Sequence, residues 1–115
     1  MPRFAVLMFE DDRAWSRLPE LERQRLLVLY GNWVRDLKAK GAFEGGDPLG
    51  EGGVVLEADD DGRILESDYT AILSVLTGYF IIQAADLAAA AKIARGCPAL
   101  VHGETVVVRP IGHEG

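Results

Sequence analysis

Residues 79–87, Tyr-Phe-Ile-Ile-Gln-Ala-Ala-Asp-Leu, join a strand to a helix and decide the fold. The aromatic and β-branched side chains of residues 79–82 are typical of a buried strand. Asp86 is a natural helix N-cap, and Gly96 is placed to end the helix that follows it. Alternate side chains of a strand point to opposite faces, so this apolar run predicts a sheet that needs cover on both faces.

The flanking segments predict a single α+β domain over residues 1–115. The pattern indicates a strand at residues 4–9, a long helix between Pro19 and Gly41, a glycine-rich loop with a short strand near residues 43–44, a hairpin of residues 54–57 and 63–66 that turns at Asp61-Gly62, and a last strand at residues 105–111. This order is typical of a ferredoxin-like α/β sandwich, in which two helices cover one face of an antiparallel sheet.

The second sheet face predicts a partner. Residues 4–9, Phe-Ala-Val-Leu-Met-Phe, are apolar on both faces, as are residues 79–82. Two helices cover one face, and a second copy of the chain is the simplest cover for the other. We therefore expect a homodimer packed sheet to sheet.

The composition disfavours several functional classes. The net charge of -6 disfavours nonspecific binding to nucleic acid or to an anionic membrane. The uncharged residues 69–85 approach membrane-spanning length, but Ser, Thr, Gly and Gln interrupt them. A single cysteine, Cys97, excludes an internal disulfide and favours a reducing compartment, and no targeting signal is recognisable. We expect a cytoplasmic protein.

No pattern indicates a metal or an organic cofactor. Asp59, Asp60 and Asp61 lack the alternate spacing and the closing glutamate of a calcium loop, so they are assigned to a solvated hairpin tip. Phosphate-cradling glycine loops and serine-histidine-acid arrangements are also missing. Cys97 follows a helix C-terminus, where the dipole disfavours a thiolate, and it is rejected as a nucleophile.

Three residues are candidates for catalysis. Glu66 and Asp68 share one face of a strand and are either an acid-base pair or two solvated acids. His102 precedes the last strand and is either a general base or a surface loop residue.

Three further residues are candidates for ligand binding. Tyr69 and Tyr79 are placed to line a cleft between helix and sheet. Arg109, among apolar neighbours, is either an ion-pair partner or an anchor for an anionic ligand. Tyr30 and Trp33 have helical spacing and are assigned to the core.

Several stretches carry a family resemblance: Arg3-Phe4-Ala5-Val6-Leu7-Met8, Tyr30-Gly31, Gly46-Asp47-Pro48-Leu49, Gly78-Tyr79-Phe80-Ile81-Ile82, Ala85-Asp86-Leu87, Gly96-Cys97-Pro98 and Val106-Val107-Val108-Arg109-Pro110-Ile111. In these the chain resembles the YCII-related proteins, in the subgroup named for its Asp-Gly-Pro-Phe motif. The resemblance implies a dimeric ferredoxin-like α+β barrel.

The motif itself is degenerate. Counted back from Gly78-Tyr79, its positions hold Glu66-Ser67-Asp68-Tyr69, and the usual following Glu and Lys positions hold Ala71 and Leu73. A shifted register aligns Asp68 with the motif aspartate instead. Some YCII-related proteins are proposed to use a His-Asp pair, but their histidine does not evidently fall at position 102.

Two functions follow as hypotheses. The first is a small-molecule-binding homodimer, which the resemblance links to extracytoplasmic-function sigma factors as an accessory protein. The alternative is a cofactor-independent isomerase or lyase that transfers a proton on a small cyclic or carbonyl-bearing molecule, by analogy of fold with muconolactone-isomerase-like dimers. Apolar Ala71 and Leu73 favour the first, while Glu66, Asp68 and His102 leave room for the second.

Overall fold

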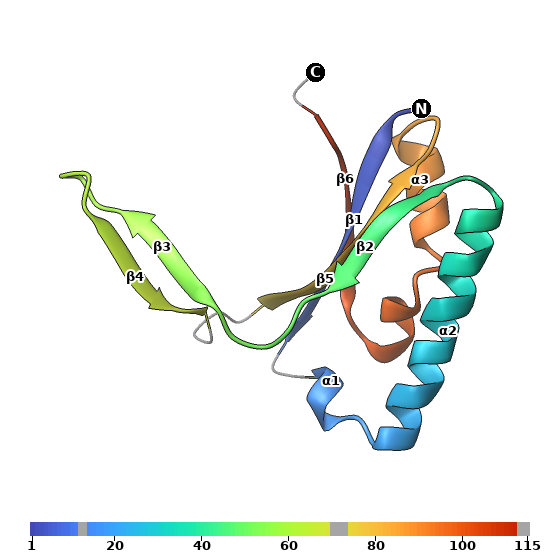
Figure 1. The fold of residues 1–115 in the computed structure, drawn as a ribbon, viewed down its shortest axis with the longest axis horizontal. Coiled ribbons are helices and arrows are strands. Elements are labelled where there is room, and N and C mark those ends of the chain that lie inside the picture. The colour runs from blue at the N-terminus through green and yellow to red at the C-terminus, as the bar shows by residue number, and fades with distance from the viewer. Residues whose placement is uncertain (12–13, 70–73, 113–115) are drawn as a thin grey trace.

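A four-stranded antiparallel sheet with helices on one face forms the body of the domain (Figure 1). The computed structural model describes residues 1–11, 14–69 and 74–112. The elements in chain order are β1 (Arg3–Asp11), α1 (Ala14–Arg17), α2 (Glu20–Ala39), β2 (Phe43–Pro48), β3 (Val54–Ala58), β4 (Ile64–Asp68), β5 (Ser74–Gln83), α3 (Leu87–Ala94), the 3-10 helix η2 (Pro98–His102) and β6 (Thr105–Pro110). The sheet order β2-β5-β1-β6 confirms the predicted ferredoxin-like class.

Alternation along the central strands separates a buried face from an open one. Phe4, Val6 and Met8 of β1 are buried on the side of the helices, and Ile82 of β5 is fully buried there. The intervening residue Leu7 is half-buried on the opposite face. The period of two in a strand therefore fixes which side chains form the core.

The two main helices follow their sequence signals. Leu26 and Leu37 of α2 are buried, and Pro19 precedes its first turn. The carboxylate of Asp86 accepts a hydrogen bond from the backbone N–H of Ala89 at 2.8 Å, which confirms it as the cap of α3. The small residues of α3 that face the sheet let this helix approach it closely; those buried are Ala90 and Ala94.

The hairpin forms as predicted but does not join the main sheet. β3 and β4 pair only with each other among the described strands, and together they extend away from the domain (Figure 1). We call residues 54–68 the arm. Its turn is closed by Asp59, whose carboxylate accepts the backbone N–H groups of Asp61 and Arg63 at 2.9 Å each, and Gly62 adopts φ 83°.

The fourth strand of the sheet is β2, which the sequence indicates only as a short strand inside a loop. Gly46 makes this pairing possible, since its φ of 156° is open to glycine and a Cβ there would lie 2.6 Å from Phe80 Cδ1. Within the described ranges, no helix has the length and apolarity needed to cross a bilayer.

Candidate functional site

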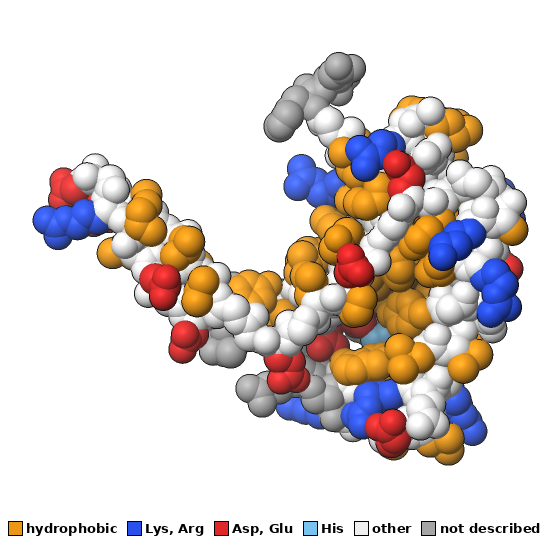
Figure 2. Space-filling view, viewed as in Figure 1, with side chains coloured by type: hydrophobic (Ala, Val, Ile, Leu, Met, Phe, Trp, Pro, Cys, Tyr) orange, Lys and Arg blue, Asp and Glu red, His pale blue; other side chains and the backbone are white. Residues whose placement is uncertain are grey.

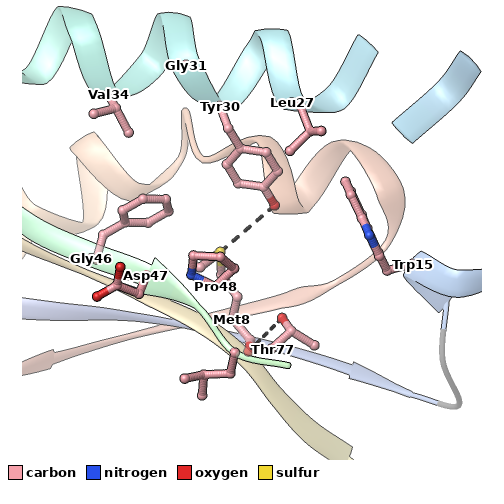
Figure 3. A pocket seen from close by; sticks show the side chains of 12 residues that line it. Met8, Trp15, Leu27, Tyr30, Gly31, Val34, Gly46, Asp47, Pro48 and Thr77 are labelled. Carbon is pink, nitrogen blue, oxygen red and sulfur yellow. Dashed lines mark hydrogen bonds between the residues drawn. The ribbon is translucent and has the colours of Figure 1, made fainter. Parts of the chain in front are cut away.

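A cavity of about 630 Å³ lies between α2 and the sheet. Figure 2 shows hydrophobic side chains around this hollow, with histidine and acidic surface at its base. Five elements and the residue that follows β2 supply its walls (Figure 3), and the lining residues are Met8, Trp15, Leu27, Tyr30, Gly31, Val34, Gly46, Asp47, Pro48, Leu49, Thr77 and Phe80. The lining is mainly apolar, and hydroxyl groups come from Tyr30 and Thr77.

A tight turn behind the cavity brings a histidine and a glutamate together. The helix η2 ends at His102, and Gly103 then adopts the left-handed conformation with φ 84°. The backbone N–H of Glu104 donates to the carbonyl of Ala99 at 3.1 Å, which closes the turn before β6. As a result the side chains of His102 and Glu104 are each 4% exposed.

These two side chains connect the two cavity hydroxyls. His102 Nε2 lies 3.0 Å from Glu104 Oε2 and 3.1 Å from the Tyr30 hydroxyl. The Thr77 hydroxyl donates to Glu104 Oε1 and lies 3.2 Å from the carbonyl oxygen of Met8. The four residues Tyr30, His102, Glu104 and Thr77 form one hydrogen-bonded group, the polar array, whose two ends line the cavity.

The contacts of His102 indicate which ring nitrogen carries a proton. A carboxylate accepts hydrogen bonds, so we assign an N–H to Nε2, facing Glu104. Among the described residues, Nδ1 is buried without a hydrogen-bond partner. The ring of Trp15 packs edge-on against the imidazole with centroids 5.7 Å apart. The ring is therefore held by contacts on more than one side.

Burial and charge set the protonation of the surrounding groups. Burial, reinforced by the negative charge of Glu104, raises the pKa of Tyr30 well above its ordinary value, so its hydroxyl stays protonated. Burial also raises the pKa of Glu10, although the backbone N–H of Trp15 donates to Glu10 Oε2 at 3.0 Å and opposes the shift.

Cys97 lies under the same region and is buried. The thiol is 1% exposed, and burial raises its pKa to about 11. This supports its rejection as a nucleophile. Burial, rather than the helix C-terminus, is the first cause that disfavours the thiolate.

Of the predicted catalytic residues, the structure places His102 beside the cavity and the two acids elsewhere. Of the two alternatives for His102, the surface loop residue is wrong, because the loop folds under Trp15 and Tyr30 and buries the side chain. Glu66 and Asp68 are exposed on the arm, opposite Leu56 and Val54 in the hairpin register. Their role as an acid-base pair stays a prediction. Ala71 and Leu73 lie outside the described residues.

The predicted ligand-binding residues lie outside the cavity lining. The Tyr79 hydroxyl donates to Asp47 Oδ2 at 3.3 Å, and the Tyr69 hydroxyl accepts the backbone N–H of Leu76 at 3.3 Å. Arg109 is exposed on β6. Tyr30, by contrast, packs against the core as its helical spacing predicts, but it is only half-buried and also lines the cavity.

Sequence reasoning missed Glu104, Thr77 and the site role of Tyr30. The segment His102-Gly103-Glu104 carries one usable signal, an acid two residues from a histidine across a glycine. Nothing local marks Thr77 or Tyr30, because β5 and α2 bring them to the same cavity from distant parts of the chain.

The comparisons with known proteins identify a family. No curated protein matches the chain in sequence. The Asp-Gly-Pro-Phe subgroup stays a prediction. The model of the YCII-related domain matches residues 3–111, nearly the whole length, and the chain therefore belongs to the YCII-related domain family.

Proposed function

We propose that this protein is a homodimer that binds a small, mainly apolar molecule carrying a neutral oxygen function. The cavity with the polar array at its wall is the observation that carries the ligand part of the proposal. Its volume of about 630 Å³ is in the range of small-molecule sites, which combine apolar walls with a few placed polar groups.

The charge of the lining residues limits the class of ligand that the cavity can bind. Among the described residues, Asp47 is the one charged residue that lines the cavity, and no described lysine or arginine lines it. An anionic ligand would therefore lack a counter-charge in this apolar site. A neutral molecule with a carbonyl or hydroxyl group matches the hydroxyls of Tyr30 and Thr77.

Thermal-shift measurements with a panel of neutral aromatic and alicyclic ketones, lactones and alcohols test the ligand. Gly31 lines the cavity, and a Cβ built there meets no atom within 4 Å. We expect Gly31→Phe to fill the cavity and abolish the shifts, while the matched control Gly31→Ala keeps them. Absence of a shift across the panel, or shifts that survive Gly31→Phe, would contradict the proposal.

The open face of the sheet supports the dimer. The residues on this face are half-buried or exposed without a helix above them, and they include Ala5, Leu7, Tyr79, Ile81 and Val107. Such a face excludes water when a second copy packs on it.

Charge complementarity also favours a second copy as the partner. The arm carries the acids Glu57, Asp59, Asp60, Asp61, Glu66 and Asp68 against the single base Arg63. The open face carries Arg109 beside its apolar residues. Opposite charges on two surfaces of one chain match each other when two copies meet.

Light scattering at micromolar concentration tests the dimer. We expect a dimeric mass, a monomeric mass for Leu7→Glu, and a dimeric mass for the control Leu21→Glu, whose side chain is 61% exposed on α2. We expect Arg109→Glu to weaken the dimer. Adding Glu57→Lys and Glu66→Lys to the Arg109→Glu variant is expected to restore it. A monomeric wild-type protein would contradict the dimer.

The link to extracytoplasmic-function sigma factors and the cytoplasmic location stay predictions. The first is tested by co-purification with sigma factors encoded beside the gene, and the second by fractionation of cells that produce the protein.

A further inference from the structure

We propose that the cavity catalyses the keto-enol interconversion of a neutral carbonyl compound, with Thr77 and Glu104 acting as the base and Tyr30 as the donor to the enolate oxygen. This inference rests on the proposed ligand site and adds a reaction to it. Figure 3 shows the two hydroxyls entering one space, Tyr30 from α2 and Thr77 from the sheet.

Tyr30 has a proton available for a ligand. His102 Nε2–H donates to Glu104, and Nε2 also lies 3.1 Å from the Tyr30 oxygen. The Tyr30 oxygen therefore accepts from His102 rather than donating to it. The hydroxyl proton is left facing Met8 Sδ at 3.9 Å, a weak acceptor that itself borders the cavity. A carbonyl oxygen is a better acceptor, and an enolate oxygen better still.

Glu104 supplies the base through Thr77. Its side chain is buried, accepts from Thr77 on one oxygen, and contacts His102 with the other. Thr77 lines the cavity, whereas Glu104 lies behind it. A hydroxyl that donates to a carboxylate can pass its proton inward as it takes another from the ligand.

The proton balance closes without a cofactor. The carbon next to the carbonyl loses a proton to Thr77 Oγ1, and the Thr77 proton moves to Glu104 Oε1. The electron pair of the broken C–H bond forms the C=C bond, and the carbonyl pair becomes the enolate oxygen charge held by the Tyr30 O–H. Return of the proton from Glu104 through Thr77 to the enolate oxygen gives the enol, and its return to carbon regenerates the ketone.

His102 is a positioning residue in this arrangement. Its N–H fixes Glu104 Oε2, leaving Oε1 for Thr77, and its contact with Tyr30 fixes the hydroxyl that meets the ligand. The edge of Trp15 holds the imidazole plane.

Benzoylacetone and acetylacetone are the probes, because the ultraviolet absorbance of their enols reports the interconversion rate and calorimetry reports their binding. We expect the wild-type protein to accelerate the interconversion of at least one. We expect Tyr30→Phe, Thr77→Val and Glu104→Gln each to lower kcat roughly 100-fold or more while the probe still binds. The matched control Glu57→Gln, on the exposed arm, keeps the wild-type rate.

The role of His102 is read from the split between kcat and KM. We expect His102→Leu to lower kcat at nearly unchanged KM, and His102→Gln, which keeps an N–H for Glu104, to recover most of the rate. Thermal unfolding shows whether a variant has lost activity because it fails to fold. Thr77→Ser keeps the hydroxyl, so it must retain the activity that Thr77→Val loses.

The outcomes separate the two proposals. Binding of a probe without acceleration, or acceleration that survives Glu104→Gln, overturns this inference and leaves the ligand site standing. Failure of both diketones to bind, while other neutral molecules bind, overturns the assignment of the carbonyl class. Failure of every neutral molecule to bind overturns the ligand site itself.

Discussion

The central strand β5 and the strands of the arm both carry β-branched residues, but their surroundings are opposite. Ile82 of β5 is fully buried against the helices, whereas Ile64 of the arm is 66% exposed. Both isoleucines suit a strand, because β-branched side chains favour extended backbone. Strand propensity therefore decided the local conformation in both regions, and the cover supplied by other elements decided burial. An isolated two-stranded hairpin is marginally stable in water, so the arm has the most to gain from a partner.

Truncation of the two isoleucines gives the largest expected contrast. Ile82→Ala removes fully buried methyl groups and leaves a cavity, and we expect it to lower the free energy of unfolding by roughly 2–5 kcal/mol. Ile64→Ala is expected to change it by less than about 0.5 kcal/mol at low protein concentration. Urea denaturation measures both. A large cost for Ile64→Ala that grows with protein concentration would show that the arm is buried between copies.

The glycines of the two regions give the next contrast. A Cβ at Gly46 would collide with the carbonyl oxygen of Tyr79 and the ring of Phe80, so we expect Gly46→Ala to cost roughly 3 kcal/mol in unfolding free energy. Gly62 has φ 83° and open space around it, and Gly62→Ala is expected to cost roughly 1–2 kcal/mol, for the backbone alone. Urea denaturation measures both variants. An equal loss of unfolding free energy in Gly46→Ala and Gly62→Ala would contradict the close approach of β2 to β5 at Gly46.

Backbone propensity gives a smaller effect of opposite sign. Gly31 lies inside α2 with open space for a Cβ, so we expect Gly31→Ala to stabilise the domain by roughly 0.5–1 kcal/mol. In the arm, Ala58→Val raises strand propensity, and we expect the global unfolding free energy to stay within about 0.5 kcal/mol. Denaturation midpoints compare the two, and a destabilised Gly31→Ala variant would be inconsistent with this account.

The smallest expected effect is a change in pH dependence. Burial raises the pKa of Glu10 above its ordinary 4.5, so between that value and the raised pKa the folded protein holds more protons than the unfolded one. Stability contributed by this group therefore falls as the pH rises through that window. We expect Glu10→Gln to remove this fall in the unfolding free energy, while the control Glu66→Gln on the arm retains it. Identical pH profiles for wild type and Glu10→Gln would refute the assignment.

More of the fold than of the candidate site could be predicted from the sequence. The cap at Asp86, the turn at Asp61-Gly62 and the long helix from Pro19 rest on short-range rules and are confirmed. The pairing of β2 with β5 depends on a close approach at Gly46, which no local pattern announces. The same limit explains Tyr30, since helical spacing assigns a side chain to a face but does not say whether that face meets core or cavity.

Local sequence patterns predicted the two main helices, the hairpin, the strands β1, β5 and β6, the family and the alternation that makes both faces of the sheet apolar, because these depend on neighbouring residues. The tertiary structure decided that His102 is buried with Glu104, that Tyr30 and Thr77 meet at one cavity, and that Glu66 and Asp68 lie on the arm. Tyr30 and His102 are 72 positions apart and Thr77 and Glu104 are 27 apart, so their contact follows only from the packing of α2, β5 and the turn before β6.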